Sequence, residues 1–493
     1  MDDTPTDAGD VGAASDDGGK ALPAAIRSLL HPKAIYAVLV IVPVALFVWI
    51  VLSGTSMPAA VGIAAAPGTA VAAVQTYLNL SLFLTQIAVI IAVARVLGIL
   101  LKRLGQPQVV GEMVAGLALG PSLLGWLWPD ASAWLFPAGT VRYLGALSQL
   151  GIVLFMFLVG LELDLTSLRN RSRHILVISH GGMALPMLGG GLLALLLYHD
   201  YATAKTSFMQ FSLFLGCAMS VTAFPVLARI LADRGLGATS LGATAMACAA
   251  VADVSAWALL ALSVSLERGA GDVSAILLRM GLGATVFLGV MFFGVRRLLA
   301  WYWRNPGTST KGLDANGFSL TLLVVLLAAL TTEMLNAHAI FGAFVAGVAM
   351  PRDAKLCAAI KARMEDLLVV LLLPLFFAFT GLRTNVGLLS TSRDWWLAGL
   401  ILAVAVAGKL GGSALAARAS GICWREANAL GVLMNARGLM ELVLLTIGLQ
   451  DGVITPALFT MMVIMAVVTT MITSPALARL VPARAERENG PPG

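Results

Sequence analysis

The stretch Ser220-Val221-Thr222-Ala223-Phe224-Pro225 interrupts an apolar run that covers residues 208–231. Proline removes one helical hydrogen bond and clashes with the preceding turn, so Pro225 predicts a helix that breaks at mid-depth. A second stretch, Asn435-Ala436-Arg437-Gly438, places polar residues and a glycine inside the run 427–449. Unwound backbone is tolerated deep in a membrane only inside protein or beside water. The sequence therefore predicts two broken helices with polar backbone near their centres.

The composition around these breaks is that of a polytopic membrane protein. Of the 493 residues, 59% are hydrophobic and 12% are charged, whereas a soluble protein carries about 25% charged residues. The mean hydropathy is +0.90. A water-soluble core cannot bury so much apolar surface, so lipid must be the solvent for most of it. The apolar runs predict fourteen membrane helices, over residues 34–53, 77–101, 109–126, 144–163, 175–198, 208–231, 241–265, 276–301, 317–337, 339–350, 367–382, 395–417, 427–449 and 455–477.

The distribution of lysine and arginine orients these helices. With the N-terminal tail placed in the cytoplasm, the cytoplasmic segments hold 23 basic residues and the opposite side holds five. Membrane proteins carry such an excess in their cytoplasmic loops. Dropping one helix would scramble the bias, so the short helix 339–350 belongs to the set. We predict a multi-pass protein of the inner (cytoplasmic) membrane with both termini in the cytoplasm.

The predicted helices divide into two halves of opposite topology. Each half has six helices, and one linker helix joins the halves. Because the linker crosses the membrane once, the first helix of the second half starts on the opposite side of the membrane from the first helix of the first half. Inverted repeats are a common plan of secondary transporters, and broken helices at matching positions mark the transport site. The first helix, 34–53, is an accessory. A cleaved signal peptide is its alternative reading, which the acidic tail before it disfavours. The expected order begins with a disordered acidic cytoplasmic tail (1–33), the accessory helix with an outer loop (34–76) and the first repeat (77–265). It continues with the linker helix (266–316), the second repeat (317–481) and a cytoplasmic tail (482–493).

Asp253 is the clearest candidate for an ion site. It lies about twelve residues into the predicted helix 241–265, which places it ~18 Å deep at about 1.5 Å per residue. An ionisable residue at that depth is a functional candidate by default. Burial disfavours the charged form of a carboxylate and a nearby cation favours it, and competition between H⁺ and a metal cation requires such a balance. The alternative is a structural ion pair.

Other charges inside the predicted spans have two readings each. Lys409 either pairs with Asp253 while the cation is absent or neutralises the C-terminal ends of helices. Arg437 and Glu441 are four residues apart and can pair with each other, which favours a structural role. Glu112 lies toward the cytoplasmic end of its helix, where it either lines an entry route or is a snorkelling, structural charge.

No motif points to an enzyme. The sequence contains no P-loop, HExxH or GxSxG pattern and no cluster of metal ligands. The cysteines form no CxxC pair, which argues against a disulfide framework and against a zinc site. The net charge of +6 reflects the basic cytoplasmic loops rather than a nucleic-acid surface. We therefore expect no catalytic residue, no cofactor and no nucleic-acid partner.

Five stretches together resemble the second monovalent cation:proton antiporter family, in the branch of Kef-type transporters and plant cation/H⁺ exchangers. They follow the family's order over about residues 77–481, and they are GQPQVVGEMVAG (105–116), GIVLFMFLVGLE (151–162), SVTAFPVLAR (220–229), Asp253 with Ala256-Trp257, and LMNARGLME (433–441). Jointly these motifs are highly specific for the family.

The resemblance implies an inverted-repeat antiporter fold with two crossed broken helices. It also implies a homodimer in which a mobile core domain moves like an elevator against a scaffold domain. Asp253 is then expected to bind a monovalent cation, Na⁺ or K⁺, and a proton in turn, helped by polar groups around Thr222. Lys409 looks like a membrane lysine that some relatives carry. The broken-helix site would comprise Ser220, Pro225, Asn435, Arg437 and Gly438.

One departure from the family pattern bears on the stoichiometry. Ala252 stands where relatives carry Asn, Gln or a second Asp, so one titrating carboxylate is missing. We predict electroneutral exchange of one proton per cation, although a titrating Lys409 would add a proton.

Two rival classes of function use the same architecture. A sodium- or proton-coupled carrier of a small organic ion needs a wide polar pocket, and the sequence offers few extra polar groups for one. A cation channel needs a pore motif and a membrane sensor usually carries a soluble output domain, and neither is evident.

Overall fold

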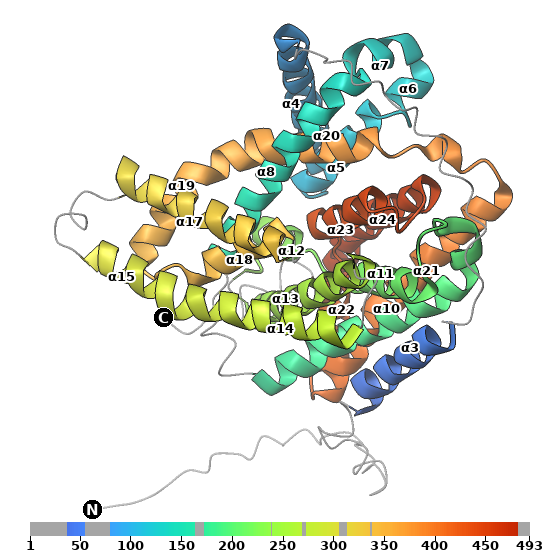
Figure 1. Cartoon of the computed structure of the whole chain (residues 1–493). Coiled ribbons are helices and arrows are strands. Elements are labelled where there is room, and N and C mark those ends of the chain that lie inside the picture. The colour runs from blue at the N-terminus through green and yellow to red at the C-terminus, as the bar shows by residue number, and fades with distance from the viewer. Residues whose placement is uncertain are drawn as a thin grey trace, which may run out of the picture.

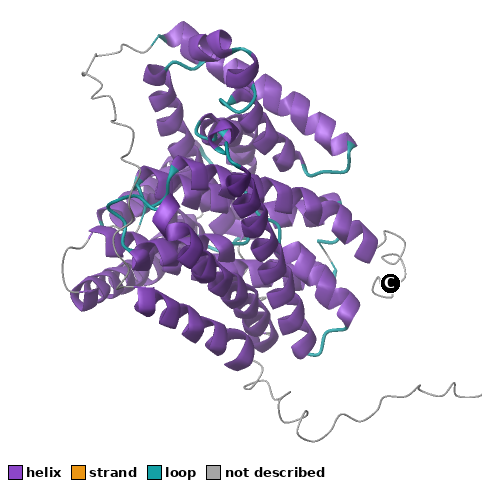
Figure 2. Ribbon diagram, turned by 90° about the vertical axis from the view of Figure 1, so that its right-hand side faces the viewer, coloured by secondary structure: helices purple, strands orange, loops and turns teal. Residues whose placement is uncertain are grey.

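The computed structural model describes residues 37–54, 79–162, 172–237, 239–268, 273–304, 313–335 and 338–481. Helices and loops make up these ranges (Figures 1 and 2), in which an isolated bridge joins Ala202 to Ile454. The predicted all-α class is confirmed. The predicted tails 1–33 and 482–493 lie outside the described residues, as does most of the outer loop that precedes residue 79.

Length and composition identify the membrane-crossing helices. Within the described ranges, nine helices are long and apolar enough to cross a membrane. The pair Trp424–Met434 and Leu439–Gln450, bent by 41°, passes the same test as one broken span. Four shorter apolar helices, Val38–Ser53, Phe208–Ser220, Ser240–Asp253 and Ala339–Ala349, fill the remaining places. A helix therefore stands at each of the fourteen positions predicted from the sequence.

One group of helices, here called the scaffold bundle, surrounds the crossing of α5 and α20. It consists of α4 (Leu80–Arg103), α5 (Gln108–Leu119), the short α6 (Leu124–Leu127) and α7 (Pro129–Leu135), α8 (Ala138–Glu162), α17 (Ala315–Met334), α18 (Ala339–Ala349), α19 (Ala354–Leu367), η4 (Leu368–Leu372) and α20 (Leu373–Leu382). Helix α5 packs between α4 and α20, and α8 packs on α18 and α20 (Figure 1).

The second group, the core bundle, is built around α10. It consists of α3 (Val42–Ser53), α10 (Ser172–Tyr201), α11 (Phe208–Ser220), α12 (Phe224–Asp233), α13 (Ser240–Arg268), α21 (Ser392–Ala419), α22 (Trp424–Met434), α23 (Leu439–Gln450) and α24 (Pro456–Leu480). Helix α10 packs along α21 and α11, and α22 packs on α21 and α24. The linker helix, α14 (Val273–Gly289), η3 (Val290–Val295) and α15 (Arg296–Arg304), contacts the core through α13 and the scaffold through α18.

Each half of the chain contributes equally to the two bundles. The first half supplies α4, α5 and α8 to the scaffold and α10, the α11–α12 pair and α13 to the core. The second half supplies α17, α18 and α19–α20 to the scaffold and α21, the α22–α23 pair and α24 to the core. This is the inverted-repeat arrangement predicted from the sequence, with a broken helix as the fifth helix of each half.

Two predicted helices differ from the structure for identifiable reasons, one in where it begins and one in its continuity. The helix predicted to begin at 367 begins at Ala354, because the Asp353 side chain caps it by accepting hydrogen bonds from the amides of Lys355 and Leu356. The charged residues of its first turns lower the local hydropathy, so the apolar run used for the prediction did not include them. The span predicted over 109–126 runs from Gln108 to Leu127, but it is interrupted where α5 ends at Leu119 and Gly120 follows in extended conformation.

Glycines bring helices into close contact inside each bundle. A Cβ atom on Gly381 of α20 would overlap the backbone of Gly116 on α5, and one on Gly190 of α10 would lie 2.7 Å from the Cα of Gly216 on α11. Small residues allow such close backbone approach in membrane proteins. In the described ranges, and leaving the linker helix aside, no glycine of one bundle has its close neighbours in the other.

Gly381→Ala is expected to lower thermal stability by about 1–3 kcal/mol, because the new methyl group overlaps helix backbone, which cannot move aside as a side chain can. The measurement is thermal unfolding of the purified protein in detergent. Gly399→Ala on α21 is the matched control, since a Cβ there meets nothing within 4 Å. The control should be neutral or gain up to ~1 kcal/mol of helix propensity. Equal melting temperatures for the two variants would refute this account of the α5–α20 crossing.

The accessory helix packs on the core bundle. The Phe47 side chain of α3 is 1% exposed. It lies against the backbone of Gly191 and Gly216, where a Cβ atom would come within 2.7 Å of the Phe47 ring. Helix α3 therefore belongs to the core bundle by its contacts with α10 and α11.

Candidate functional site

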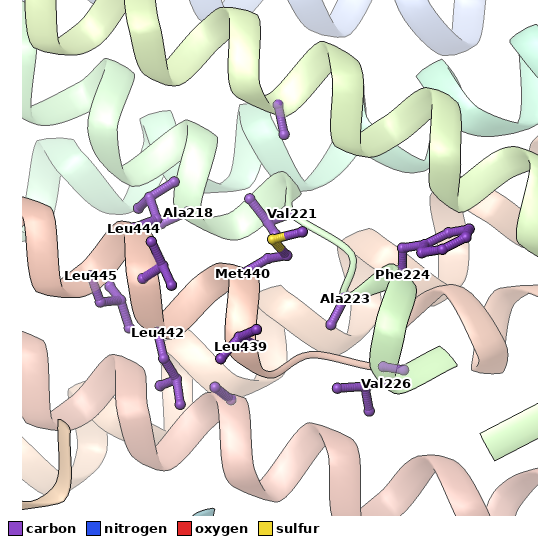
Figure 3. Close-up of a cluster of buried hydrophobic side chains, with 14 of the residues drawn as sticks. Ala218, Val221, Ala223, Phe224, Val226, Leu439, Met440, Leu442, Leu444 and Leu445 are labelled. Carbon is purple, nitrogen blue, oxygen red and sulfur yellow. The ribbon is translucent and has the colours of Figure 1, made fainter. Parts of the chain in front are cut away.

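The two broken helices cross at their breaks. The segment 221–223 joins α11 to α12, and the segment 435–438 joins α22 to α23. The amide of Ala223 donates a hydrogen bond to the carbonyl of Ala436 (3.0 Å), and the Thr222 hydroxyl donates to the carbonyl of Met434 (3.4 Å). Figure 3 shows the apolar side chains of both helices packed around these breaks.

Local sequence explains where each broken helix resumes. Pro225 stands in the first turn of α12, where its missing amide hydrogen costs nothing and its fixed φ suits the helix start. Gly438 precedes α23, and a Cβ atom there would lie 2.7 Å from the Val226 side chain of α12. A larger residue at 438 would push the two restarting helices apart.

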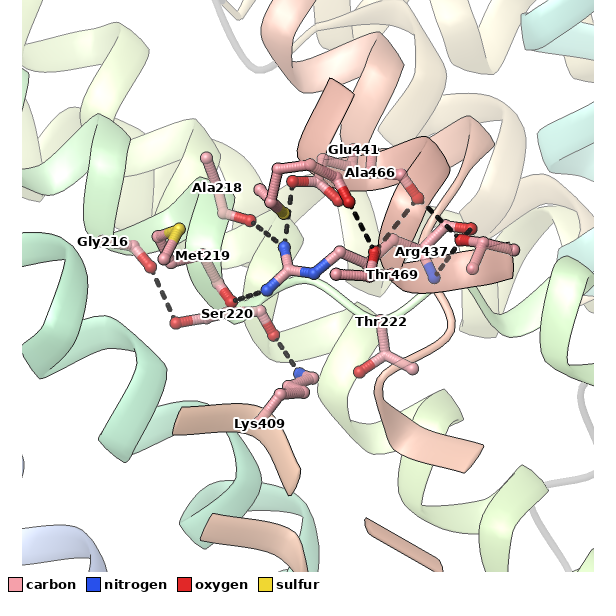
Figure 4. A network of polar contacts seen from close by, with 12 residues as sticks. Gly216, Ala218, Met219, Ser220, Thr222, Lys409, Arg437, Glu441, Ala466 and Thr469 are labelled. Atoms are coloured by element: carbon pink, nitrogen blue, oxygen red, sulfur yellow. Dashed lines mark hydrogen bonds and ion pairs between the residues drawn. The ribbon is translucent and has the colours of Figure 1, made fainter. Parts of the chain in front are cut away.

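Two cationic side chains hold the C-terminal end of α11. Arg437 donates to the carbonyls of Ala218 (3.1 Å) and Met219 (2.8 Å), and the Lys409 ammonium donates to the carbonyl of Ser220 (Figure 4). The last carbonyls of a helix lack intrahelical partners and carry partial negative charge. The positive charges therefore stabilise a helix end that is buried inside the core bundle.

Arg437 also forms an ion pair with Glu441 on the following helix. The Nη1–Oε1 distance is 2.9 Å and both side chains are fully buried. The amide of Arg437 donates to the Thr470 hydroxyl (3.0 Å), which ties the break to α24. The sequence correctly predicted the Arg437–Glu441 pairing. It gave no sign that the same guanidinium caps another helix.

Asp253 lies on α13 with 2% of its surface exposed. Neither of its carboxylate oxygens accepts a hydrogen bond from a side chain in the described part of the chain. Its favourable electrostatic neighbours are Lys409 and the amide of Phe224, at the start of α12. A buried carboxylate with so few hydrogen-bond partners is costly, and either a metal cation or a proton would relieve that cost.

Of the two roles that the sequence left open for Lys409, the structure does not contain the ion pair with Asp253. Among the described residues, no ion pair with a nitrogen–oxygen distance of 4 Å or less joins the Lys409 ammonium to the Asp253 carboxylate, whereas Arg437 and Glu441 form such a pair. The Lys409 ammonium instead donates a hydrogen bond to the carbonyl of Ser220 at the end of α11. This is the second of those roles, the neutralisation of a helix C-terminal end. The bare carbonyl at a helix break competes for the ammonium group, and hydropathy patterns do not reveal such a partner.

The other predicted polar residues lie around the crossing in different ways. The Ser220 hydroxyl donates back to α11 and to the carbonyl of Met183 (3.0 Å), so it secures the helix end. The side-chain oxygen of Asn435 is buried without a partner in the described structure.

Glu112 belongs to a separate polar cluster on α5. It is 2% exposed and accepts a hydrogen bond from Gln108 (3.1 Å), whose own oxygen accepts one from Arg229 of α12 (2.8 Å). Sequence reasoning did not select Gln108 or Arg229, although both lie within the quoted motifs.

Known proteins resemble this chain in sequence over most of its length. Residues 88–482 match the family model "Sodium/hydrogen exchanger, transmembrane". The chain is 42% identical over 409 residues to the Na(+)/H(+) antiporter NhaS4 of Synechocystis, covering 83% of this chain and 99% of that protein. It is 39% identical to Cation/H(+) antiporter 20 of Arabidopsis thaliana and 35% identical to K(+)/H(+) antiporter 1 of Saccharomyces cerevisiae, with 80% of this chain covered in each case. It spans 48% and 46% of those two longer proteins.

A solved structure shares the fold. The sodium proton antiporter MjNhaP1 from Methanocaldococcus jannaschii aligns with a TM-score of 0.56 over 81% of this chain and 96% of its own, at 15% identity. At that identity the likeness speaks for the fold alone. The family model and the relatives above 30% identity decide the family: this chain belongs to the sodium/hydrogen exchangers.

Proposed function

We propose that the chain exchanges Na⁺ or K⁺ for H⁺ across the membrane, with Asp253 binding the cation and the proton in turn. The observation that carries the proposal is the buried Asp253 carboxylate, which no side chain of the described structure bonds and which has the amide of Phe224 as its backbone donor group. Such a group needs a cation or a proton, and it can hold only one of them strongly at a time. The Thr222 hydroxyl at the neighbouring break donates to Met434, which leaves its oxygen lone pairs for a cation.

An elevator-type movement of the core bundle fits the packing. The close glycine contacts lie within the bundles and join neither to the other in the described ranges. Closely packed interfaces resist sliding, whereas looser ones allow rigid-body movement. In this proposal Asp253 and both breaks travel with the core, and α3 travels with them because it packs on α10 and α11.

The proposed orientation places the basic loops in the cytoplasm, with both termini on that side of the cell membrane. The end of α12, the loop between α4 and α5 and the end of α24 then face the cytoplasm together. The resemblance in sequence supports a homodimer. One chain has a mass of 51.3 kDa. A native mass spectrum of the purified homodimer would show twice that mass.

Proteoliposomes with a trapped pH dye test the exchange. Addition of NaCl or KCl should move protons in the opposite direction to the cation, and choline chloride should have no effect. The exchange should be electroneutral, because Ala252 leaves Asp253 without a neighbouring carboxylate. A membrane potential should therefore not accelerate it, although each net charge moved would gain ~2.3 kcal/mol per 100 mV. Silence with both metal cations and flux with an organic ion would replace the proposal by the carrier alternative.

A further inference from the structure

A groove of about 580 Å³ runs between the linker helix, yellow-green in Figure 1, and α17. On the linker it extends from Leu282 to Val295, which is ~20 Å at about 1.5 Å per residue. Phe287 and Met291 line its bottom and are buried, whereas Val290 lines its edge and is 55% exposed. The groove is therefore open to the surroundings of the protein over more than half of the ~30 Å that a hydrocarbon core measures.

The lining of the groove is apolar. Among the described residues that line it, Thr331 of α17 supplies the one polar side chain, and its hydroxyl donates to the carbonyl of Leu327 in its own helix (2.7 Å). Apolar cavities in proteins stay dry and accept apolar ligands. For a protein that spans a membrane, the apolar ligand present in excess is a lipid acyl chain.

Two arginines stand directly beyond one end of the groove. Arg296 and Arg297 follow the lining residue Val295, and both are exposed. Within the described ranges neither guanidinium forms an ion pair with a carboxylate. The neighbouring sequence offers them none, because residues 273–313 contain no aspartate or glutamate, whereas residues 296–311 contain four arginines and lysines. An anionic partner for these arginines therefore has to come from outside this part of the chain.

Helix α15, which begins with the two arginines, has the composition of a segment at a membrane surface. On the same helix Leu298 is 59% exposed and Trp301 is 63% exposed. Tryptophan is enriched where hydrocarbon meets water, and a cluster of basic residues directly cytoplasmic of a membrane helix indicates binding of anionic lipids. In the proposed orientation this end of the linker faces the cytoplasm. Arg296 and Arg297 then lie at the depth of the headgroup phosphates of the cytoplasmic leaflet.

A second copy of the chain fits this end of the groove less well than a lipid does. The interface of a two-fold dimer brings the same patch of both subunits together, so it would bring two copies of the arginine pair into contact, and like charges repel. A phosphate group instead accepts paired, charge-assisted hydrogen bonds from arginine. The charge next to the groove therefore favours a phospholipid as its occupant.

We propose that this groove binds one anionic phospholipid of the cytoplasmic leaflet, with an acyl chain between the linker helix and α17 and the phosphate on Arg296 and Arg297. The bound lipid joins the linker to the scaffold bundle, because the linker forms one side of the groove and α17 forms the other. The linker also contacts the core bundle through α13. The lipid site is separate from the crossing of the broken helices, so the inference does not depend on the exchange proposed for Asp253.

Native mass spectrometry of the purified protein in detergent measures the bound lipid directly. Titration with dioleoyl phosphatidylglycerol should add the mass of one lipid to each chain before any further lipid binds. Dioleoyl phosphatidylcholine has the same acyl chains, but its choline group neutralises the phosphate, so it should bind more weakly. Glycerol phosphate carries the anionic group without acyl chains and should not bind in the same concentration range. Binding of glycerol phosphate as tight as that of phosphatidylglycerol would replace the lipid by a free anion and overturn the proposal.

Arg296→Gln combined with Arg297→Gln should weaken the binding of phosphatidylglycerol by roughly thirtyfold, because each basic residue contributes to the attraction of an anionic lipid. The matched control is Lys102→Gln combined with Arg103→Gln. It also removes two exposed basic residues from the end of a helix, α4, which does not line the groove. Equal affinities of the two double variants for phosphatidylglycerol would overturn the proposal.

Val290→Trp tests the acyl-chain part of the site while both arginines stay in place. The larger side chain at the edge of the groove should weaken the binding of phosphatidylglycerol by at least about tenfold, because the chain loses buried apolar area. Phe293→Trp is the matched control, since Phe293 is 71% exposed on the same helix and does not line the groove. Both positions are exposed, so neither substitution crowds the core of the protein.

Two further outcomes would overturn the lipid site. One is unchanged affinity for phosphatidylglycerol in Val290→Trp. The other is a Val290→Trp protein that changes from dimer to monomer and keeps its lipid, which would assign the groove to a second copy of the chain. Absence of cation-driven proton flux in the parent would instead overturn the proposed function and leave the lipid site standing, because the binding measurement involves no transport.

Discussion

Asp253→Asn should reduce cation-driven proton flux by up to about a hundredfold and should leave the fold as stable as the parent or more so. The asparagine keeps the size of the side chain but loses the charge and the titrating group. Loss of a charged ligand costs up to ~3 kcal/mol of cation binding, which is about a hundredfold in affinity. Stability should not fall, because no side chain of the described structure donates a hydrogen bond to the parent carboxylate, and the asparagine oxygen can still face the amide of Phe224.

Flux in proteoliposomes and thermal unfolding in detergent give the two readouts. Asp233→Asn is the matched control, because Asp233 is an exposed residue at the end of α12 and lies outside the crossing. The control should exchange at the parent rate. A variant at position 253 that exchanges normally would contradict the assignment, and one that is inactive because it unfolds would point to a structural carboxylate.

Arg437→Met should have the opposite profile, with a loss of stability of about 3–5 kcal/mol, the range measured when one partner of a buried ion pair is removed. Glu441 would remain as a buried charge without its partner, and the carbonyls of Ala218 and Met219 would lose their donors. The measurement is thermal or denaturant unfolding of the purified variant beside the parent.

The double variant Arg437→Met with Glu441→Leu separates two contributions to that loss. Apolar residues of similar size often replace a buried ion pair at little cost, so the double variant should recover the part due to stranded Glu441. The part that remains measures the capping of α11. A double variant as unstable as the single one would assign the whole effect to the helix end, and full stability of the single variant would contradict the structural role of Arg437.

The helices of this fold follow from local sequence. Apolar length predicts the spans, and the charge bias secures even the short helix 339–350, which the structure contains as α18. Pro225 and Gly438 marked both breaks because their effects act on their own backbone. The start of α19 escaped prediction, since its cap at Asp353 precedes charged turns that hydropathy assigns to a loop.

The partners of the buried charges do not follow from local sequence. Arg437 and Glu441 lie one helical turn apart, so their pairing was predictable. The bond from Arg437 to the end of α11 joins residues 219 positions apart, and that of Lys409 spans 189 positions. Only the crossing of the two breaks brings these groups together. The same reason hid Arg229 and Gln108, whose contact joins two bundles.

Proton release on cation binding tests the central claim most directly. Purified protein in weakly buffered detergent solution, near the pH at which binding of the two ions is balanced, receives NaCl, KCl or choline chloride while a pH dye is followed. The account predicts the release of about one proton per bound cation, as competition for a single carboxylate requires, with Na⁺ or K⁺ but not with choline, and none from Asp253→Asn. Cation binding without proton release, or equal release from the variant, would contradict it.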